Sequence, residues 1–112
     1  AESKLAEYSE FAHLYINSIV YTEVSNSFKK IEELESALTR GGFRMLEIPK
    51  EALFLAGKAF LNYRKRRGIQ RSPLPDFYIG AHAAIFDMEL ITRDVSLYRT
   101  YFPSVRLVSP KI

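Results

Sequence analysis

Hydrophobic positions along the chain follow two spacings, one typical of helices and one typical of strands. Apolar residues three or four positions apart indicate amphipathic helices, and short runs rich in β-branched and aromatic residues indicate strands. The predicted helices cover residues 3–11, from 18 or 20 to 28, 31–38, 50–66, 76–86 and 95–101. The predicted strands cover residues 14–20, 43–48, 89–93 and 105–109. Because strands alternate with helices, we expect an α/β fold, a three-layer α/β/α sandwich around a short, mainly parallel sheet.

The long helix predicted over residues 50–66 is expected to turn one apolar face to the core, because apolar side chains recur on it at spacings of three and four. The residues of this face are Leu53, Ala56, Phe60 and Tyr63. An aromatic series is likewise expected in the core, and not as a platform on which nucleic-acid bases stack. Its members are Phe54, Phe60, Tyr63 and Phe77. Gly68 is expected to end the long helix.

The composition is that of a single globular domain, expected to span residues 1–112. Apolar residues make up 47% and charged residues 26%, which excludes a disordered chain. The chain has no cysteine, so disulfide frameworks and thiolate zinc sites are excluded, and two histidines leave little for a histidine metal cage. No apolar run reaches the roughly 18 residues of a membrane-spanning helix, and no signal-peptide pattern opens the chain. We therefore expect a soluble, cytoplasmic protein with no membrane partner.

Charge is divided unequally between the two halves of the chain. Residues 1–56 carry six Lys or Arg against nine Asp or Glu, and residues 57–112 carry ten against four. Five cations fall within eight positions of the basic half, with no acid among them: Arg64, Lys65, Arg66, Arg67 and Arg71. A polymer that carries phosphates is a plausible partner for such a cluster. The alternative is a solvated helix end, where cations are favoured by the helix dipole.

Two acidic residues follow predicted strand ends, where open α/β sheets bind ligands, and a third follows a turn fixed by proline. Glu23 is expected near the start of the helix after residues 14–20, and Asp94 directly follows residues 89–93. Asp76 opens the helix of residues 76–86, after a proline-bounded turn. Carboxylates without histidine or cysteine suit Mg²⁺ or Mn²⁺.

Each of these acids also has an ordinary structural interpretation. Asp76 and Asp94 are each placed to cap the helix that follows, because an aspartate oxygen accepts a hydrogen bond from an unpaired N–H in the first turn. Glu23 resembles any exposed helix glutamate. His13 and His82 have no partner motif, so both are interpreted as packing or surface residues.

Three stretches of the chain resemble one protein family: IVYTEVS, SPLPDFYIGAHAAIFDMELITRD and YRTYFPSVRLVSP. Together they are similar to the PIN-domain ribonucleases, and specifically to the VapC-type toxins of bacterial toxin–antitoxin pairs. The resemblance implies hydrolysis of RNA, often tRNA, with Mg²⁺ or Mn²⁺ held by Glu23, Asp76 and Asp94. The resemblance also implies that the hydroxyl of Thr92 supports Asp94 without binding the ion itself. The basic cluster at residues 64–71 would then contact the RNA phosphates.

The resemblance also implies protein partners, because VapC-type toxins are usually bound by a VapB-type antitoxin and commonly form homodimers. One feature departs from the family pattern. The family begins with an apolar strand that ends in Asp-Thr or Asp-Ser, whereas residues 1–11 read as the helix that normally follows it. We therefore expect residues 1–112 to be an N-terminally truncated PIN-like domain that lacks its first central strand and first acid. The alternative is that the chain truly diverges from the family pattern. The alternative function is a catalytically silent PIN-like module that binds RNA or an antitoxin.

Overall fold

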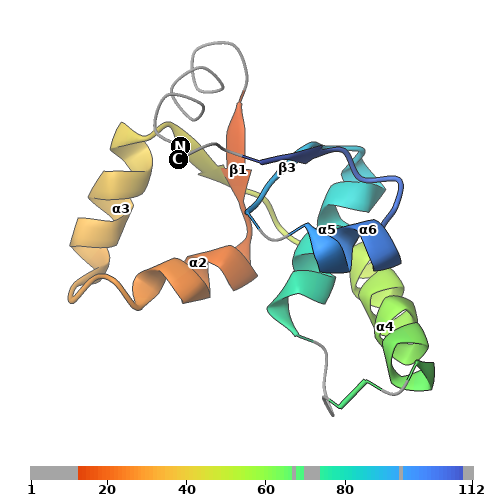
Figure 1. The fold of residues 1–112 in the computed structure, drawn as a ribbon. Helices are drawn as coiled ribbons and strands as arrows, with labels where there is room; N and C mark the ends of the chain where they lie inside the picture. Colours follow the sequence, from red (N-terminus) through yellow and green to blue (C-terminus); the bar gives the residue numbers. More distant parts are fainter. Residues whose placement is uncertain (1–12, 67, 70–73, 94, 110–112) are drawn as a thin grey trace. The chain divides into compact units, whose positions relative to one another are not determined.

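A computed structural model of the chain describes residues 13–66, 68–69, 74–93 and 95–109 (Figure 1). The helix predicted over residues 3–11 lies outside this part. The chain divides into two compact units, which we describe separately. The first comprises Ala1–Glu47 and Lys111–Ile112, and the second comprises Ile48–Pro110.

Two short strands and two helices make up the described part of the first unit. They are β1 (Leu14–Ile16), α2 (Ser18–Ser25), α3 (Ile31–Arg40) and β2 (Phe43–Met45). The strands pair in parallel, with Leu14 opposite Phe43 and Ile16 opposite Met45. The Tyr21 hydroxyl of α2 donates to a carboxylate oxygen of Glu35 in α3 at 2.7 Å, and this hydrogen bond raises the pKa of Tyr21.

The strand predicted over residues 14–20 is wrong in length, because a helix begins inside the apolar run. Asn17 is buried, and its side-chain carbonyl accepts a hydrogen bond from the backbone N–H of Val20 at 3.0 Å. An asparagine in this position caps one of the free N–H groups of a helix. Helix α2 therefore starts at Ser18, and it ends at Ser25, three residues before the predicted end.

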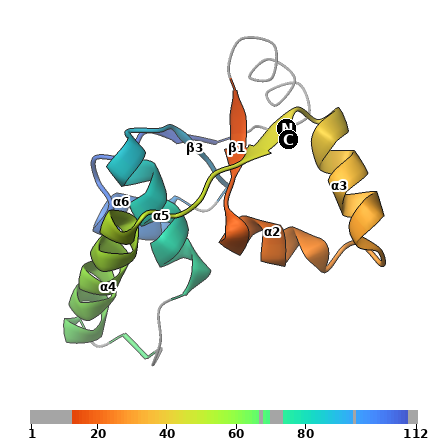
Figure 2. The same cartoon turned by 180° about the vertical axis from the view of Figure 1, so that it is seen from behind.

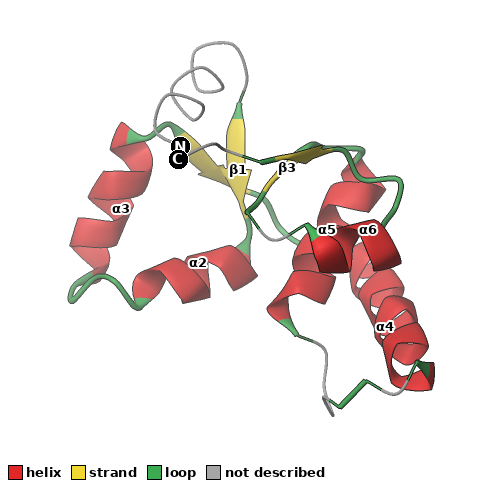
Figure 3. Ribbon diagram, in the orientation of Figure 1, coloured by secondary structure: helices red, strands yellow, loops and turns green. Residues whose placement is uncertain are grey.

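The second unit contains three helices and two short strands in its described part (Figures 2 and 3). They are α4 (Lys50–Lys65), α5 (Pro75–Phe86), β3 (Leu90–Ile91), α6 (Ser96–Tyr101) and β4 (Leu107–Val108). Strands β3 and β4 pair in parallel, and Thr92 extends the ladder by donating its N–H to the carbonyl of Val108 at 3.0 Å. Both strand pairs of the described residues are thus parallel, which confirms the predicted α/β fold with parallel strands.

Helices α4 and α5 lie side by side (Figures 1 and 2), and small residues on α4 allow this approach. The buried face of α4 consists of Ala52, Ala56 and Ala59. On α5, a Cβ added at Gly80 would lie 2.5 Å from the ring of Phe102, so the absence of a side chain makes room for that ring. No described helix is long and apolar enough to span a membrane.

The aromatic core of the second unit centres on Phe77, which is fully buried. Its ring contacts four other rings, those of Phe60, Tyr63, Tyr101 and Phe102. The core prediction was wrong for two residues of α4, because Leu53 is 45% exposed and Phe54 is 68% exposed. The buried face of the helix is formed by the alanines at 52, 56 and 59, and these two larger side chains lie outside it.

Candidate functional site

Asp76 is the second residue of α5, and Pro75 precedes it in the first helical turn. The residue at the N-cap position is Leu74, which has no side-chain hydrogen bond to the helix. The prediction that Asp76 is the helix cap is therefore wrong by position, because the helix begins one residue earlier than expected. A proline suits this start, since its missing N–H would have had no partner in the helix. The carboxylate of Asp76 instead lies in the first turn, where the helix dipole favours a negative charge.

The hydroxyl of Tyr98 in α6 donates a hydrogen bond to Oδ1 of Asp76 at 3.0 Å. Tyr98 is only 3% exposed, so its ring is held by the core, while Asp76 is partly exposed. Among the described residues, no other hydrogen bond or ion pair reaches the Asp76 carboxylate. Its second oxygen, Oδ2, is thus left without a protein partner in this part of the chain.

Tyr98 is a residue that sequence reasoning missed. It lies 22 positions after Asp76, and the pairing depends on how α5 and α6 pack. The sequence shows a tyrosine within the helix predicted over residues 95–101, and a tyrosine needs a partner for its hydroxyl when it is buried.

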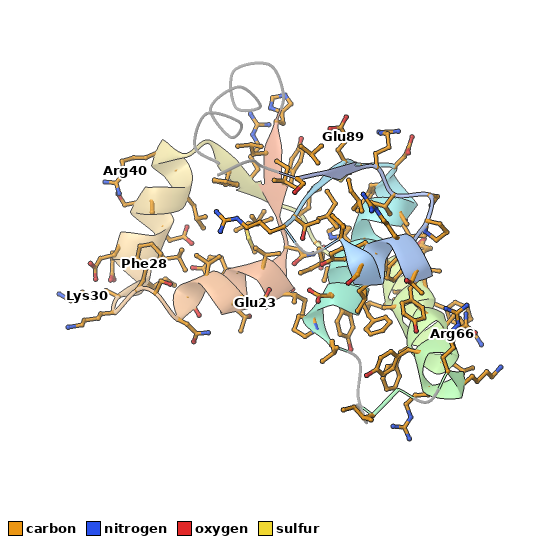
Figure 4. All side chains as sticks on the ribbon, in the orientation of Figure 1. Glu23, Phe28, Lys30, Arg40, Arg66 and Glu89 are labelled. Atoms are coloured by element: carbon orange, nitrogen blue, oxygen red, sulfur yellow. The ribbon has the colours of Figure 1, made fainter. Side chains whose placement is uncertain are left out.

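Glu23 is the sixth of the eight residues of α2 and is exposed (Figure 4). The prediction that it lies near the start of its helix is wrong, because α2 begins at Ser18. Glu23 belongs to the first unit and Asp76 to the second, and Asp94 lies outside the described residues. Within the described ranges, no three His, Cys, Asp or Glu side chains are grouped so that they could hold a metal ion. The metal site of Glu23, Asp76 and Asp94 stays a prediction.

The basic cluster lies at the C-terminal end of α4. Arg64 and Lys65 are in the last turn, Arg66 follows it, and all three are exposed. The guanidinium of Arg66, labelled in Figure 4, lies 5.7 Å from the centre of the Tyr101 ring, and a guanidinium Nη1 of Arg64 donates to the carbonyl of Gly68 at 3.3 Å. Arg67 and Arg71 lie outside the described residues.

Lys65 and Arg66 make no ion pair with any residue that the structure describes. A helix C-terminus favours such cations, so their position alone fits both interpretations offered by the sequence. The structure shows in addition that no described acid pairs with Lys65 or Arg66 and that both side chains are exposed to solvent.

The two histidines lie in different surroundings. His82 is 6% exposed and packs against the ring of Phe86, and burial lowers the pKa of its imidazole. His13 is exposed beside Tyr15. The prediction that they are packing or surface residues is confirmed.

A family model for the PIN domain matches residues 1–103 of the chain. The chain belongs to the PIN-domain family. PIN domains are generally nucleases, and the family generally uses divalent metal ions. The predicted family membership is thus confirmed.

The fold of this PIN domain is also found in a solved structure, that of VapBC2 from Rickettsia felis bound to a DNA fragment from their promoter. The match has a TM-score of 0.73 at 19% sequence identity, and it covers 98% of this chain and 84% of that chain. No match is found among curated proteins. At this identity the structural match establishes the fold and leaves substrate and partners to be tested.

Proposed function

We propose that this PIN domain is a metal-dependent endoribonuclease, the toxin of a VapBC-type pair, that hydrolyses RNA phosphodiester bonds. Membership of a nuclease family supports the reaction type, and the fold shared with the Rickettsia felis structure supports the kind of system. The observation that carries the proposal is the Asp76 carboxylate. One of its oxygens is held by Tyr98, and the other has no partner among the described residues.

The residues fit a hard divalent cation, because carboxylate oxygens are the ligands that Mg²⁺ and Mn²⁺ prefer. We propose Asp76, Glu23 and Asp94 as these ligands, with the hydroxyl of Thr92 supporting Asp94. When bound, the ion supplies Lewis acidity to the hydrolysis of a phosphodiester. Asp76 contributes a negative charge in an orientation fixed by the protein.

The basic end of α4 is proposed as the surface that binds RNA. It comprises Arg64, Lys65 and Arg66, together with Arg67 and Arg71. Exposed cations at a helix end contact phosphates independently of sequence, so this surface contributes affinity and not base selection. We further propose that the toxin is a cytoplasmic homodimer, a single PIN-like domain per chain, neutralised by a VapB-type antitoxin.

Cleavage of a 5′-labelled tRNA pool in the presence of Mg²⁺ or Mn²⁺ tests the reaction. Asp76→Asn removes the charge and keeps the size of the side chain, and we expect it to abolish cleavage. Asp87→Asn is the matched control. Asp87 ends the same helix in a left-handed conformation that asparagine tolerates well, and its side chain is 83% exposed. Cleavage by Asp76→Asn at the wild-type rate would exclude Asp76 as a metal ligand.

The second candidate function is a PIN-like module that binds RNA or an antitoxin without cutting. It is favoured by the position of Glu23, which is exposed and whose side chain makes no hydrogen bond or ion pair with a described residue. Calorimetric titration with Mn²⁺ separates the two functions. Binding that is lost in Asp76→Asn supports the nuclease, and no binding at millimolar Mn²⁺ supports the silent module.

A further inference from the structure

The phenol of Tyr98 joins the aromatic core of the second unit to the candidate site. Its side chain is 3% exposed and belongs to the same buried cluster as Phe77 and Phe102. Its hydroxyl reaches out of this cluster to Oδ1 of Asp76, 3.0 Å away. A side chain that is buried this completely cannot change rotamer without disturbing its neighbours. The position of the hydroxyl is therefore set by the core.

We propose that Tyr98 is a positioning residue, which holds the carboxylate of Asp76 in the orientation that binds a divalent cation. This inference rests on the proposed function. In this role Tyr98 touches neither the ion nor the RNA, since it acts on the ion through the carboxylate of Asp76. Its effect is to order the ligand before the ion arrives.

The chemistry of a phenol suits this task better than that of a cationic donor. A tyrosine hydroxyl is neutral near pH 7 and donates a single proton, so it orients the carboxylate without offsetting its charge. An arginine or lysine in its place would compete with the metal ion for that charge. No described cation pairs with Asp76, so the full negative charge is kept for a ligand.

The hydrogen bond also links two helices that are separate in the sequence. Asp76 lies in the first turn of α5, and Tyr98 lies in α6. An aspartate that is free to rotate loses side-chain entropy when it binds an ion, and a bond that fixes it beforehand lowers that cost. Partners of metal ligands typically change metal affinity by about 10- to 100-fold when they are removed.

A purely structural role makes a different prediction, because a buried tyrosine hydroxyl needs a partner whatever the function of that partner. In that case removing the hydroxyl lowers the stability of the protein and leaves its metal affinity unchanged. Metal affinity is therefore the quantity that separates the two roles.

Calorimetric titration of the full chain with Mn²⁺ tests the inference. Tyr98→Phe keeps the ring and removes the hydroxyl, and we expect Mn²⁺ to bind about 10- to 100-fold more weakly. Tyr78→Phe is the matched control. Tyr78 lies two residues after Asp76, packs against the same core, and its hydroxyl makes no hydrogen bond with a described residue. We expect this variant to bind Mn²⁺ as the wild type does.

Cleavage of the labelled tRNA pool adds a second measurement. If Tyr98 acts through metal binding, Tyr98→Phe needs more Mn²⁺ for half-maximal cleavage and reaches the wild-type rate at saturation, whereas Asp76→Asn does not. Unchanged Mn²⁺ affinity in Tyr98→Phe, with loss of binding in Asp76→Asn, overturns the positioning role and leaves the nuclease proposal intact. Wild-type affinity in Asp76→Asn overturns both.

A measurement on the unmodified protein tests whether Mn²⁺ binds beside Tyr98, which the positioning role requires, and it applies even where Tyr98→Phe does not fold. Substoichiometric Mn²⁺ broadens the NMR signals of nearby protons, so the ring signals of Tyr98 should broaden before those of Phe86. Phe86 lies ten residues after Asp76 on α5, which places it about 15 Å further along the helix. Equal broadening of both rings would overturn the inference.

Discussion

Two glycines on neighbouring helices of the second unit are expected to respond in opposite ways to the same change. Gly80 lies on α5, and a Cβ there would approach the Phe102 ring at 2.5, 2.7 and 3.0 Å. Gly57 lies on α4, and a Cβ there would meet nothing within 4 Å. The perturbation is one methyl group in both Gly80→Ala and Gly57→Ala, so the difference between them isolates packing.

The magnitude follows from two opposing effects. Alanine in a helix interior is more favourable than glycine by about 0.5–1 kcal/mol. At Gly80 this gain is opposed by overpacking, which typically costs about 1–3 kcal/mol. Phe102 is 3% exposed and its ring lies against Phe77, so it has little room to retreat. We expect Gly80→Ala to lower the free energy of unfolding by about 0.5–2 kcal/mol and Gly57→Ala to raise it by about 0.5–1 kcal/mol.

Urea denaturation followed by circular dichroism measures both changes against the wild type. A shift of the midpoint without a change of slope shows that stability itself has changed. Thermal unfolding gives an independent measure, with a shift of about 4 °C for each kcal/mol in a chain of this size. If Gly80→Ala proved as stabilising as Gly57→Ala, the close approach of Phe102 to α5 would be refuted.

Three further predictions concern the core, the buried histidine and the basic end of α4. Phe77→Ala should cost about 3–5 kcal/mol in urea denaturation, whereas Phe54→Ala, at a position 68% exposed, should change stability by less than about 0.5 kcal/mol. Burial lowers the pKa of His82 below its ordinary 6.5, so the unfolded chain takes up the proton first as pH falls. The stability contributed by neutral His82 should therefore be complete above pH 6.5 and decline below it, and His82→Leu should show a shallower decline between pH 7 and pH 5. Lys65→Ala and Arg66→Ala should each weaken binding to any single-stranded RNA and reduce the slope of log affinity against log salt by about 0.7, and an unchanged slope would exclude a phosphate contact.

The helices of the second unit could be predicted from the sequence to within two residues at each end, because their signals are local. Pro49 and Gly68 flank α4, and Pro75 opens α5. The strands could not be predicted as well. Each paired segment has only two or three residues, and its length depends on a partner strand that is remote in the sequence. At β1, the capping side chain of Asn17 stands inside an apolar run and ends the strand early.

The inward face of α4 shows why size and spacing alone misplaced two predicted core residues. Ala56 is buried, and Phe60 and Tyr63 pack against the core as predicted. Leu53 and Phe54 are exposed, because the fully buried positions of the helix are held by alanines. Two helices that lie close together need small residues between them, and a local pattern does not contain the distance to the neighbouring helix. The two large side chains are left on the exposed face, where Lys58 lies 5.0 Å above the Phe54 ring.

The hydrogen-bond partner of Asp76 in the candidate site could not be predicted from the sequence either. The sequence placed Asp76 at the start of a helix, and there capping and metal binding were competing interpretations of one carboxylate. Because the N-cap position belongs to Leu74, the capping interpretation loses its geometric basis. The bond that replaces it comes from Tyr98, a neutral donor fixed by the core, and it occupies only Oδ1. If Asp76 were the N-cap, its carboxylate would accept a hydrogen bond from an N–H group in the first turn of the helix. The hydrogen bond from Tyr98 instead orients the carboxylate and leaves its charge for a ligand.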